Sequence, residues 1–160
     1  MLRYAVIRKQ DISNGDGLRV TIFFQGCRFH CKGCWNESTW DFQGGKELTS
    51  DLIDEVIYLG KQEHISGISL LGGEPFQQDA QSLLALLIKL KEEVGKPIYL
   101  WTGYTYDKIP KTHRECLKYI DVLVDGQYIE EQANYDLKWR GSANQRILHL
   151  KKGKIKWIEQ

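Results

Sequence analysis

Three cysteines stand close together in the sequence, at Cys27, Cys31 and Cys34, with the spacing C-x3-C-x2-C. Thiolates this close together are expected to bind a metal. A closed structural site uses four protein ligands, whereas three ligands leave one position open for a substrate or a cofactor. The count of three therefore points to catalysis at a metal centre.

Three kinds of centre compete for this run. Zinc requires a fourth ligand, and His30 lies between two of the cysteines in a short loop, where four groups can hardly reach one ion. A ferredoxin-type electron carrier requires a fourth thiolate, for which only Cys116 is available, and Cys116 also fits a buried small apolar residue of a short helix. The third is a [4Fe-4S] cluster with one iron open to a chelating cofactor.

Length and composition favour one ordinary globular domain over residues 1–160. The chain is too short for a complete (β/α)8 barrel, which needs about 250 residues. Its 22 Lys and Arg nearly balance its 21 Asp and Glu, and no long block of one sign suggests binding to nucleic acid or to a membrane surface. The Lys-rich end, residues 151–156, is expected to be the solvated face of a last strand.

The expected compartment is the cytoplasm. The first eight residues lack the apolar core of a secretory signal, and no segment reaches the roughly 18 apolar residues of a membrane span. Disulfides are disfavoured in that compartment, so clustered cysteines are interpreted as metal ligands.

The elements that must position the cysteines follow an α/β pattern. Strands are expected at residues 4–8 and 19–24, joined through a glycine-containing turn at 14–17, and the cysteine run follows the second strand at once. Further strands are expected at 67–71, 98–102 and 121–124, with helices at 48–59, 78–94 and 107–119, and a last strand pair at 146–150 and 154–158. Repeated strand-then-helix units predict a mainly parallel sheet.

Each of the three inner strands ends in small or acidic residues. These endings are Gly72-Gly73-Glu74, Thr102-Gly103 and Asp125-Gly126. Because the carboxyl ends of parallel strands share one edge of a sheet, these loops and the cysteine loop are expected to converge on one site.

The cysteine run and the segment Gly72-Gly73-Glu74-Pro75 together resemble the radical S-adenosylmethionine (SAM) superfamily. A Gly-Gly turn alone is common after a buried strand, but the pair of motifs is specific. The resemblance implies that Cys27, Cys31 and Cys34 hold a [4Fe-4S] cluster and that SAM chelates its open iron. It also implies that backbone at Gly72 and Gly73 and the Glu74 side chain bind the amino group of SAM, in an incomplete TIM-type barrel with outer helices.

Gly33 departs from the superfamily pattern, which has an aromatic residue just before the last cysteine. With Gly33, the string from Cys31 to Trp40 resembles the activating proteins of anaerobic (class III) ribonucleotide reductases. The resemblance continues through residues 12–19, 100–105, 121–126 and 139–146, in the expected order along the chain.

This resemblance implies further SAM contacts. They involve the backbone around Gly33, Cys34 and Trp35, and Trp35 either stacks near the adenine or anchors the loop. Weaker candidates for ribose or carboxylate contacts are Thr102, Asp125, Asn144 and Arg146.

The function implied is activation of the anaerobic ribonucleoside-triphosphate reductase. Reductive cleavage of SAM, with an electron from a donor such as flavodoxin, yields an adenosyl radical that takes a hydrogen atom from a backbone glycine of the reductase. The alternatives are activation of another glycyl radical enzyme such as a formate-lyase, a small-molecule radical SAM reaction, and a non-catalytic role as an iron–sulfur carrier or a zinc module.

Overall fold

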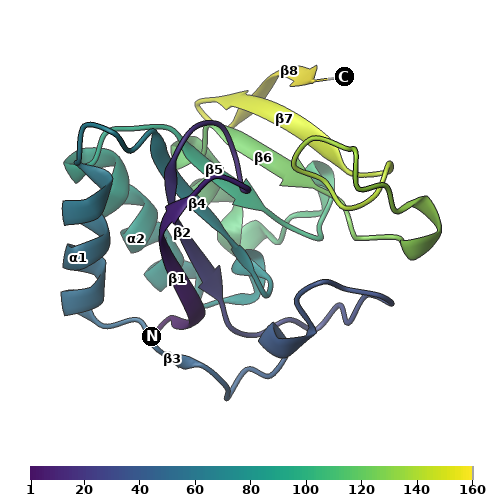
Figure 1. Cartoon of the computed structure of the whole chain (residues 1–160), viewed down its shortest axis with the longest axis horizontal. Helices are drawn as coiled ribbons and strands as arrows, with labels where there is room; N and C mark the ends of the chain where they lie inside the picture. The colour runs from purple at the N-terminus through teal and green to yellow at the C-terminus, as the bar shows by residue number, and fades with distance from the viewer. Residues whose placement is uncertain (160) are drawn as a thin grey trace.

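The computed structural model describes residues 1–159, which form one mixed sheet of eight strands with two α-helices (Figure 1). The strands are β1 (Arg3–Asp11), β2 (Arg19–Phe24), β3 (Lys46–Glu47), β4 (Gly67–Gly72), β5 (Ile98–Trp101), β6 (Val122–Asp125), β7 (Arg146–Lys151) and β8 (Lys154–Glu159). The α-helices are α1 (Ser50–Gly60) and α2 (Ala80–Glu93). Every strand expected from the sequence is present, and only the two-residue β3 was not anticipated.

The order of strands across the sheet is β3-β1-β2-β4-β5-β6-β7-β8. The inner pairs β2–β4, β4–β5 and β5–β6 are parallel, whereas β1–β2, β1–β3, β6–β7 and β7–β8 are antiparallel. The expectation of a mainly parallel sheet was therefore wrong for the whole sheet and right only for its centre. Two parallel strands must be joined by a long crossover connection, and α1 and α2 provide such connections in the centre of the sheet. The connection between β7 and β8 is a short turn, which can join only antiparallel strands.

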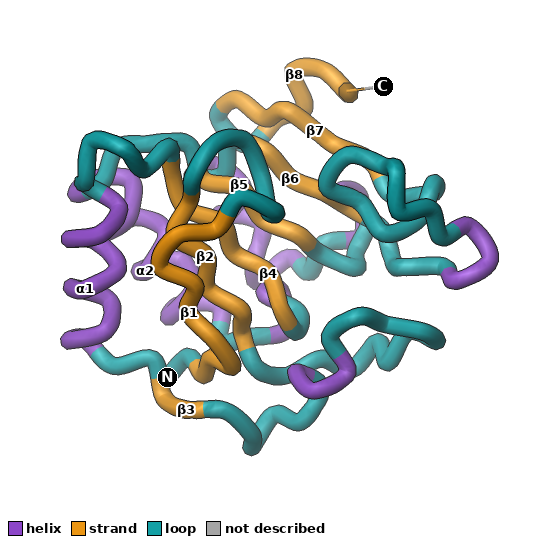
Figure 2. The backbone as a smooth tube through the Cα atoms, viewed as in Figure 1, coloured by secondary structure: helices purple, strands orange, loops and turns teal. Residues whose placement is uncertain are grey.

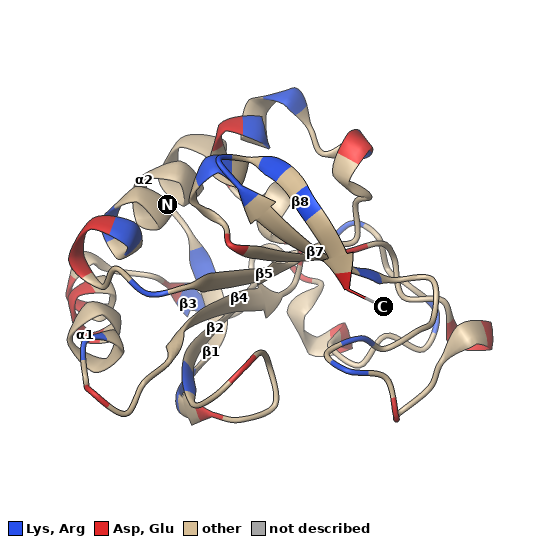
Figure 3. Ribbon diagram, turned by 90° about the horizontal axis from the view of Figure 1, so that it is seen from above, with Lys and Arg blue, Asp and Glu red and all other residues tan. Residues whose placement is uncertain are grey.

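The sheet is open, and a TIM-type barrel is not seen among residues 1–159. It ends at β3 on one side and at β8 on the other, without pairing between them. Lys and Arg gather on β8 and its turn (Figure 3), as expected for the Lys-rich end. The apolar residues interleaved there, Ile155, Trp157 and Ile158, are exposed as well.

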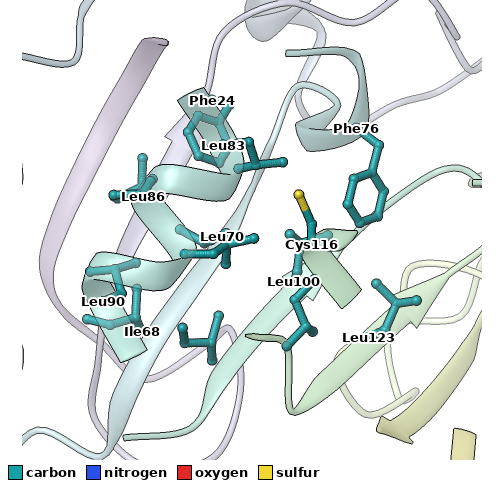
Figure 4. Close-up of a cluster of buried hydrophobic side chains, with 14 of the residues drawn as sticks. Phe24, Ile68, Leu70, Phe76, Leu83, Leu86, Leu90, Leu100, Cys116 and Leu123 are labelled. Atoms are coloured by element: carbon teal, nitrogen blue, oxygen red, sulfur yellow. The ribbon is translucent and has the colours of Figure 1, made fainter. Parts of the chain in front are cut away.

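The two α-helices pack on one face of the sheet, over the main hydrophobic core. Alternate residues of the strands, such as Ile22, Leu70 and Leu100, point into this core, where they meet leucines of α2 (Figure 4). Cys116 is part of the same core and is 1% exposed. This confirms the interpretation of Cys116 as a buried apolar residue.

Helix ends follow local sequence signals. Thr49 caps α1 by accepting a hydrogen bond from the amide of Leu52 at 3.3 Å. Gly95, at φ +70°, ends α2 and donates its amide to the carbonyl of Leu90 at 3.2 Å. Neither helix offers an apolar stretch of membrane-spanning length within the described chain.

The third expected helix, at residues 107–119, is two 3-10 segments, Tyr106–Lys108 and Lys111–Tyr119. Pro110 lies between them, and proline favours extended backbone in the residue before it, which here is Ile109 at ψ 131°. The correction leaves the apolar residues of this segment packed on the core, with Leu117 buried beside Cys116.

Two long connections lie beyond the carboxyl ends of the parallel strands (Figure 2). The first, residues 25–45, follows β2 and carries the three cysteines, and we call it the cysteine loop. The second, residues 126–145, follows β6, and we call it the late loop. The sequence predicts that both loops lie at this edge of the sheet, whereas only the tertiary structure shows how the cysteine loop and the late loop pack on each other.

Candidate functional site

The carboxyl ends of the parallel strands enclose one cavity of about 580 Å³. A volume of this size accommodates a nucleoside-sized ligand. Its lining residues come from the cysteine loop, the endings of β4 and β5, the late loop, and β1, β2 and the connection between them. Those predicted from the sequence are Cys27, Cys31, Cys34, Trp35, Gly72, Gly73, Glu74, Thr102, Gly103 and Gly126. The expected convergence of strand endings is therefore confirmed.

The three cysteines of the loop are free thiols and are all partly exposed to this cavity. The amide of Asn36 lies 3.3 Å from the sulfur of Cys34, and the sulfur of Cys31 lies 3.8 Å from Oε1 of Gln127 on the late loop. Backbone amides near sulfur are the environment in which thiolates of iron–sulfur clusters are stabilised.

The electrostatic setting separates the loop cysteines from Cys116. Burial raises the pKa of the Cys27 thiol, while the backbone amides of Phe29 and His30 act against that rise. Burial also raises the pKa of Cys31, with repulsion from Cys34 as the next cause. In the core, burial raises the pKa of Cys116 to about 12. Cys116 thus stays a neutral thiol, and the three loop cysteines are the available soft ligands.

Three free thiols on one loop fit an iron–sulfur cluster by the chemistry of their sulfur atoms. No three Cys, His, Asp or Glu side chains within residues 1–159 converge closely enough to surround one metal ion. A four-iron cluster spreads its iron atoms over the corners of a cube, so its thiolates stand farther apart than those around a single zinc ion. His30, the possible fourth zinc ligand, is instead stacked on Trp40 with ring centroids 4.3 Å apart.

Gly72 and Gly73 bring the ending of β4 against the start of the cysteine loop. The amide of Gly73 donates to the carbonyl of Phe24 at 2.8 Å, and the amide of Glu74 donates to the carbonyl of Gly26 at 2.8 Å. A Cβ atom at Gly73 would lie 2.4 Å from the Gly26 carbonyl oxygen, and one at Gly72 would lie 2.6 Å from the Phe24 nitrogen. Only glycine permits this approach.

Glu74 is 2% exposed, and its carboxylate is surrounded by protein donors. Oε2 accepts the amide of Phe76 at 2.9 Å and the hydroxyl of Thr102 at 2.7 Å, and Oε1 accepts the amide of Gly103 at 2.6 Å. Burial nevertheless raises the pKa of Glu74 to about 7, although these hydrogen bonds favour its charged form. Glu74 and Thr102 therefore tie the ending of β4 to the ending of β5.

The other weak candidates lie in a different network, outside the cavity lining. Asp125 is 1% exposed and accepts a forked pair of hydrogen bonds from Arg146, at 2.9 and 2.6 Å. Asn144 donates to the carbonyl of Gln127 at 2.7 Å. These three residues hold the two ends of the late loop together, and the structure brings none of them into the lining.

Gly33 is exposed and does not line the cavity. It has φ +75°, and a Cβ atom there would lie 2.0 Å from Oε2 of Glu130 on the late loop. Trp35 does line the cavity and is 56% exposed, so it is not a core anchor. Its ring is stacked on Tyr135 of the late loop, with centroids 5.5 Å apart and planes at 3°.

Several lining residues were missed by sequence reasoning. Half of them belong to β5 and the late loop: Trp101, Tyr128, Tyr135, Leu137, Trp139, Arg140, Gly141 and Gln145. The others come from β1, β2, the connection between them, the cysteine loop and β4: Arg8, Ser13, Asn14, Phe23, Phe29, Asn36, Trp40 and Leu71. The available signal was the density of aromatic residues at 128–139, in a segment otherwise too polar for the core. Trp101 and Trp139 are joined by a hydrogen bond from the indole nitrogen of Trp101 to the carbonyl of Trp139, at 2.7 Å.

Comparisons with known proteins agree with this picture of an iron–sulfur site. Residues 13–148 match the family model described as a 4Fe-4S single cluster domain. The chain is 45% identical to the anaerobic ribonucleoside-triphosphate reductase-activating protein of Vibrio cholerae, over 86% of this chain and 91% of the relative. It is 39% identical to the protein of the same name from Escherichia coli K12, over 88% of this chain and 94% of the relative. Enterobacteria phage T4 has another, 37% identical over 91% of this chain and 93% of the relative. The chain therefore belongs to the family of anaerobic ribonucleoside-triphosphate reductase-activating proteins, with a 4Fe-4S single cluster domain.

Proposed function

We propose that this protein is a radical SAM enzyme that activates anaerobic ribonucleoside-triphosphate reductase. The observation that carries the proposal is the convergence of three free cysteines with the Gly72-Gly73-Glu74 segment on one cavity. In this proposal Cys27, Cys31 and Cys34 hold the [4Fe-4S] cluster, and the whole chain acts as one radical SAM domain of incomplete barrel type.

A [4Fe-4S] cluster held by Cys27, Cys31 and Cys34 would supply one electron for the reductive cleavage of SAM to methionine and a 5′-deoxyadenosyl radical. This chemistry would remove a hydrogen atom from a backbone glycine of the reductase and give 5′-deoxyadenosine and a stored glycyl radical. The protein's own task is to hold the reactants in line and to exclude competing reactions.

Individual residues have distinct tasks in this scheme. Leu71, Gly72 and Gly73 line the cavity at the end of β4, and we assign their backbone carbonyls to accept hydrogen bonds from the ammonium group of SAM. Glu74 lies beside them, but its oxygens already accept hydrogen bonds from protein donors, so we assign it mainly to positioning. Trp35, on the cavity wall, offers a flat surface for the adenine.

Access of a protein substrate is supported by the open sheet. The strands do not close into a barrel, and residues of the late loop such as Tyr128, Tyr135 and Trp139 form part of the cavity wall. Trp35 and Tyr135 are both exposed at this boundary, Tyr135 by 86%. A glycine-bearing loop of a larger partner can therefore approach the cavity there. Cytoplasmic action fits the four free cysteines.

The test is anaerobic reconstitution. Protein carrying its cluster is reduced, chemically in one arm and with flavodoxin in another, and is then mixed with SAM and the reductase. We expect a glycyl-radical EPR signal and one 5′-deoxyadenosine for each radical formed. A reductase whose radical glycine is replaced by alanine gives no such signal. If the EPR spectrum of the reduced cluster does not change on addition of SAM and no 5′-deoxyadenosine forms, the protein is an electron carrier instead.

A further inference from the structure

The start of the late loop lies against the second cysteine. The sulfur of Cys31 lies 3.8 Å from Oε1 of Gln127. Burial raises the pKa of the Cys31 thiol, and the backbone amide of Tyr128 acts against that rise. Two neighbouring residues of the late loop therefore contact a sulfur that belongs to another part of the chain.

The position of Gln127 is fixed by the polar string at residues 140–146, which the cavity alone does not explain. Nδ2 of Asn144 donates to the carbonyl of Gln127 at 2.7 Å. Ser142 is buried and donates its hydroxyl to Oδ1 of Asn144 at 2.6 Å. The backbone that carries Gln127 is thus held by a chain of two side chains.

Other contacts between the two loops surround the one at Cys31. Nζ of Lys32 lies 3.9 Å from Oε1 of Glu130, and the rings of Trp35 and Tyr128 lie 5.7 Å apart. The approach of Gln127 to Cys31 is therefore part of a wider packing of the late loop on the cysteine loop.

The space around this contact leaves room for a cluster. Cys31 lines the cavity, whereas Gln127 is exposed and does not line it. A free thiol donates its S–H to the amide oxygen, but a thiolate that binds iron can only accept. A half-turn of the terminal amide of Gln127 exchanges Oε1 for Nε2, and this torsion is a soft one. The same contact can then supply an N–H to the sulfur.

We propose that the side-chain amide of Gln127 donates a hydrogen bond to the Cys31 thiolate of the bound cluster and thereby raises the cluster's reduction potential. Reduction adds negative charge to the cluster, so an N–H donor stabilises the reduced state more than the oxidised state. The contact makes the cluster easier for an electron donor to reduce. Asn144 is the positioning residue for Gln127. This inference rests on the cluster assignment of the proposed function.

The first test compares Gln127→Leu with Gln127→Glu. The leucine removes the amide, and the glutamate keeps its shape but brings a negative charge in place of a donor. The matched controls are Gln132→Leu and Gln132→Glu, because Gln132 is an exposed glutamine of the same loop whose side chain has no hydrogen bond to a cysteine within residues 1–159. All variants are reconstituted with the cluster and titrated by EPR at set potentials, without SAM.

The readout is the ratio of reduced to oxidised cluster at the potential where the wild-type cluster is half reduced. We expect this ratio to fall about threefold in Gln127→Leu, because a hydrogen bond to a charged sulfur is lost. In Gln127→Glu it should fall about tenfold, because a like charge is added as well. Both Gln132 variants should stay close to the wild type. The ratio is taken within the bound cluster, so a change in cluster content does not affect it. A wild-type ratio in Gln127→Leu, or an equal fall in Gln132→Leu, would overturn the inference.

The second test examines Asn144 through a double-mutant cycle. Asn144→Ala should lower the same ratio in the wild-type background, because Gln127 is no longer held against Cys31. In the Gln127→Leu background the same substitution should change nothing, since the donor is already absent. An equal fall in both backgrounds would show that Asn144 does not act through Gln127.

The outcomes separate this inference from the proposed function. A wild-type protein that binds its cluster and responds to SAM, together with an unchanged ratio in Gln127→Leu, refutes only the role of Gln127. A wild-type protein that assembles no cluster refutes both.

Discussion

The backbone amide of Glu74 donates a hydrogen bond to the carbonyl of Gly26 at 2.8 Å, and this contact joins the two motifs of the site. Gly26 is the residue before the first cysteine, and Glu74 ends the Gly72-Gly73-Glu74 segment. Gln78 donates from its side chain to the same Gly26 carbonyl at 3.1 Å. The position of the first cysteine is thus set by the end of β4.

Cys31→Ala is expected to abolish binding of the [4Fe-4S] cluster, because it removes one of only three thiolates that reach the cavity. Iron and sulfide content and the cluster's visible absorption after anaerobic reconstitution measure the effect. Cys116→Ala is the control: that thiol is buried in the core and should leave cluster content unchanged, at a cost in stability of about 1 kcal/mol. Full cluster content in Cys31→Ala would contradict the assignment of ligands.

Gly73→Ala should weaken the site by steric conflict, because its Cβ would lie 2.4 Å from the carbonyl oxygen of Gly26. We expect a loss of unfolding free energy of about 1–3 kcal/mol and a larger loss of cluster content. Gly95→Ala is the comparison, since Gly95 has a positive φ but its Cβ would meet nothing nearer than 3.8 Å. That variant should lose about 1 kcal/mol and keep its cluster. Equal cluster content in the two variants would argue against the contact.

Glu74 should make the protein without its cluster less stable as pH rises from about 4.5 to about 7. Burial of the carboxyl raises its pKa in the folded state to about 7, from an ordinary value of 4.5. Between these values the folded state keeps a proton that the unfolded state has released, so the stability present below pH 4.5 is lost as pH rises through 7. The full difference corresponds to about 3 kcal/mol.

The measurement is urea unfolding between pH 4 and pH 8. The side chain of the Glu74→Gln variant cannot ionise. Its unfolding free energy should therefore fall less than that of the wild type as pH rises, and the difference between the two pH profiles measures the contribution of Glu74. Glu63→Gln, on an exposed glutamate, serves as the control and should follow the wild type. The same pH profile in Glu74→Gln as in the wild type would show that Glu74 does not titrate in this range.

Tyr135→Ala should loosen the late loop without unfolding the domain. Tyr135 is exposed but is stacked on Trp35, and an aromatic pair contributes about 0.5–1.5 kcal/mol. Hydrogen exchange should become faster at amides of this loop, such as Asn134, which donates to the Gly141 carbonyl at 3.2 Å. Tyr58→Ala, on the exposed side of α1, should leave this exchange unchanged. Unaltered exchange in Tyr135→Ala would mean that other contacts hold the loop.

Local sequence was enough to predict both α-helices, the endings of the inner strands and every strand except the two-residue β3, but not the 3-10 form of residues 106–119. The alternation of Arg19–Phe24 and the apolar period of residues 80–93 are properties of short segments, and both elements are where the pattern predicts them. The cysteine spacing and the Gly-Gly turn are also local, which is why the candidate ligands could be named before the fold was known.

The sequence by itself thus determined the order of the strands along the chain, the candidate ligands and the resemblance to the family. Only the tertiary structure decided that strand pairs such as β6–β7 are antiparallel and that Asp125 and Arg146 form an ion pair. It also decided that the late loop contacts Trp35 through the ring of Tyr135. The same loop places Gln127 against the sulfur of Cys31. These features depend on contacts between residues far apart in the chain, whose partners are chosen by packing and which no local pattern encodes.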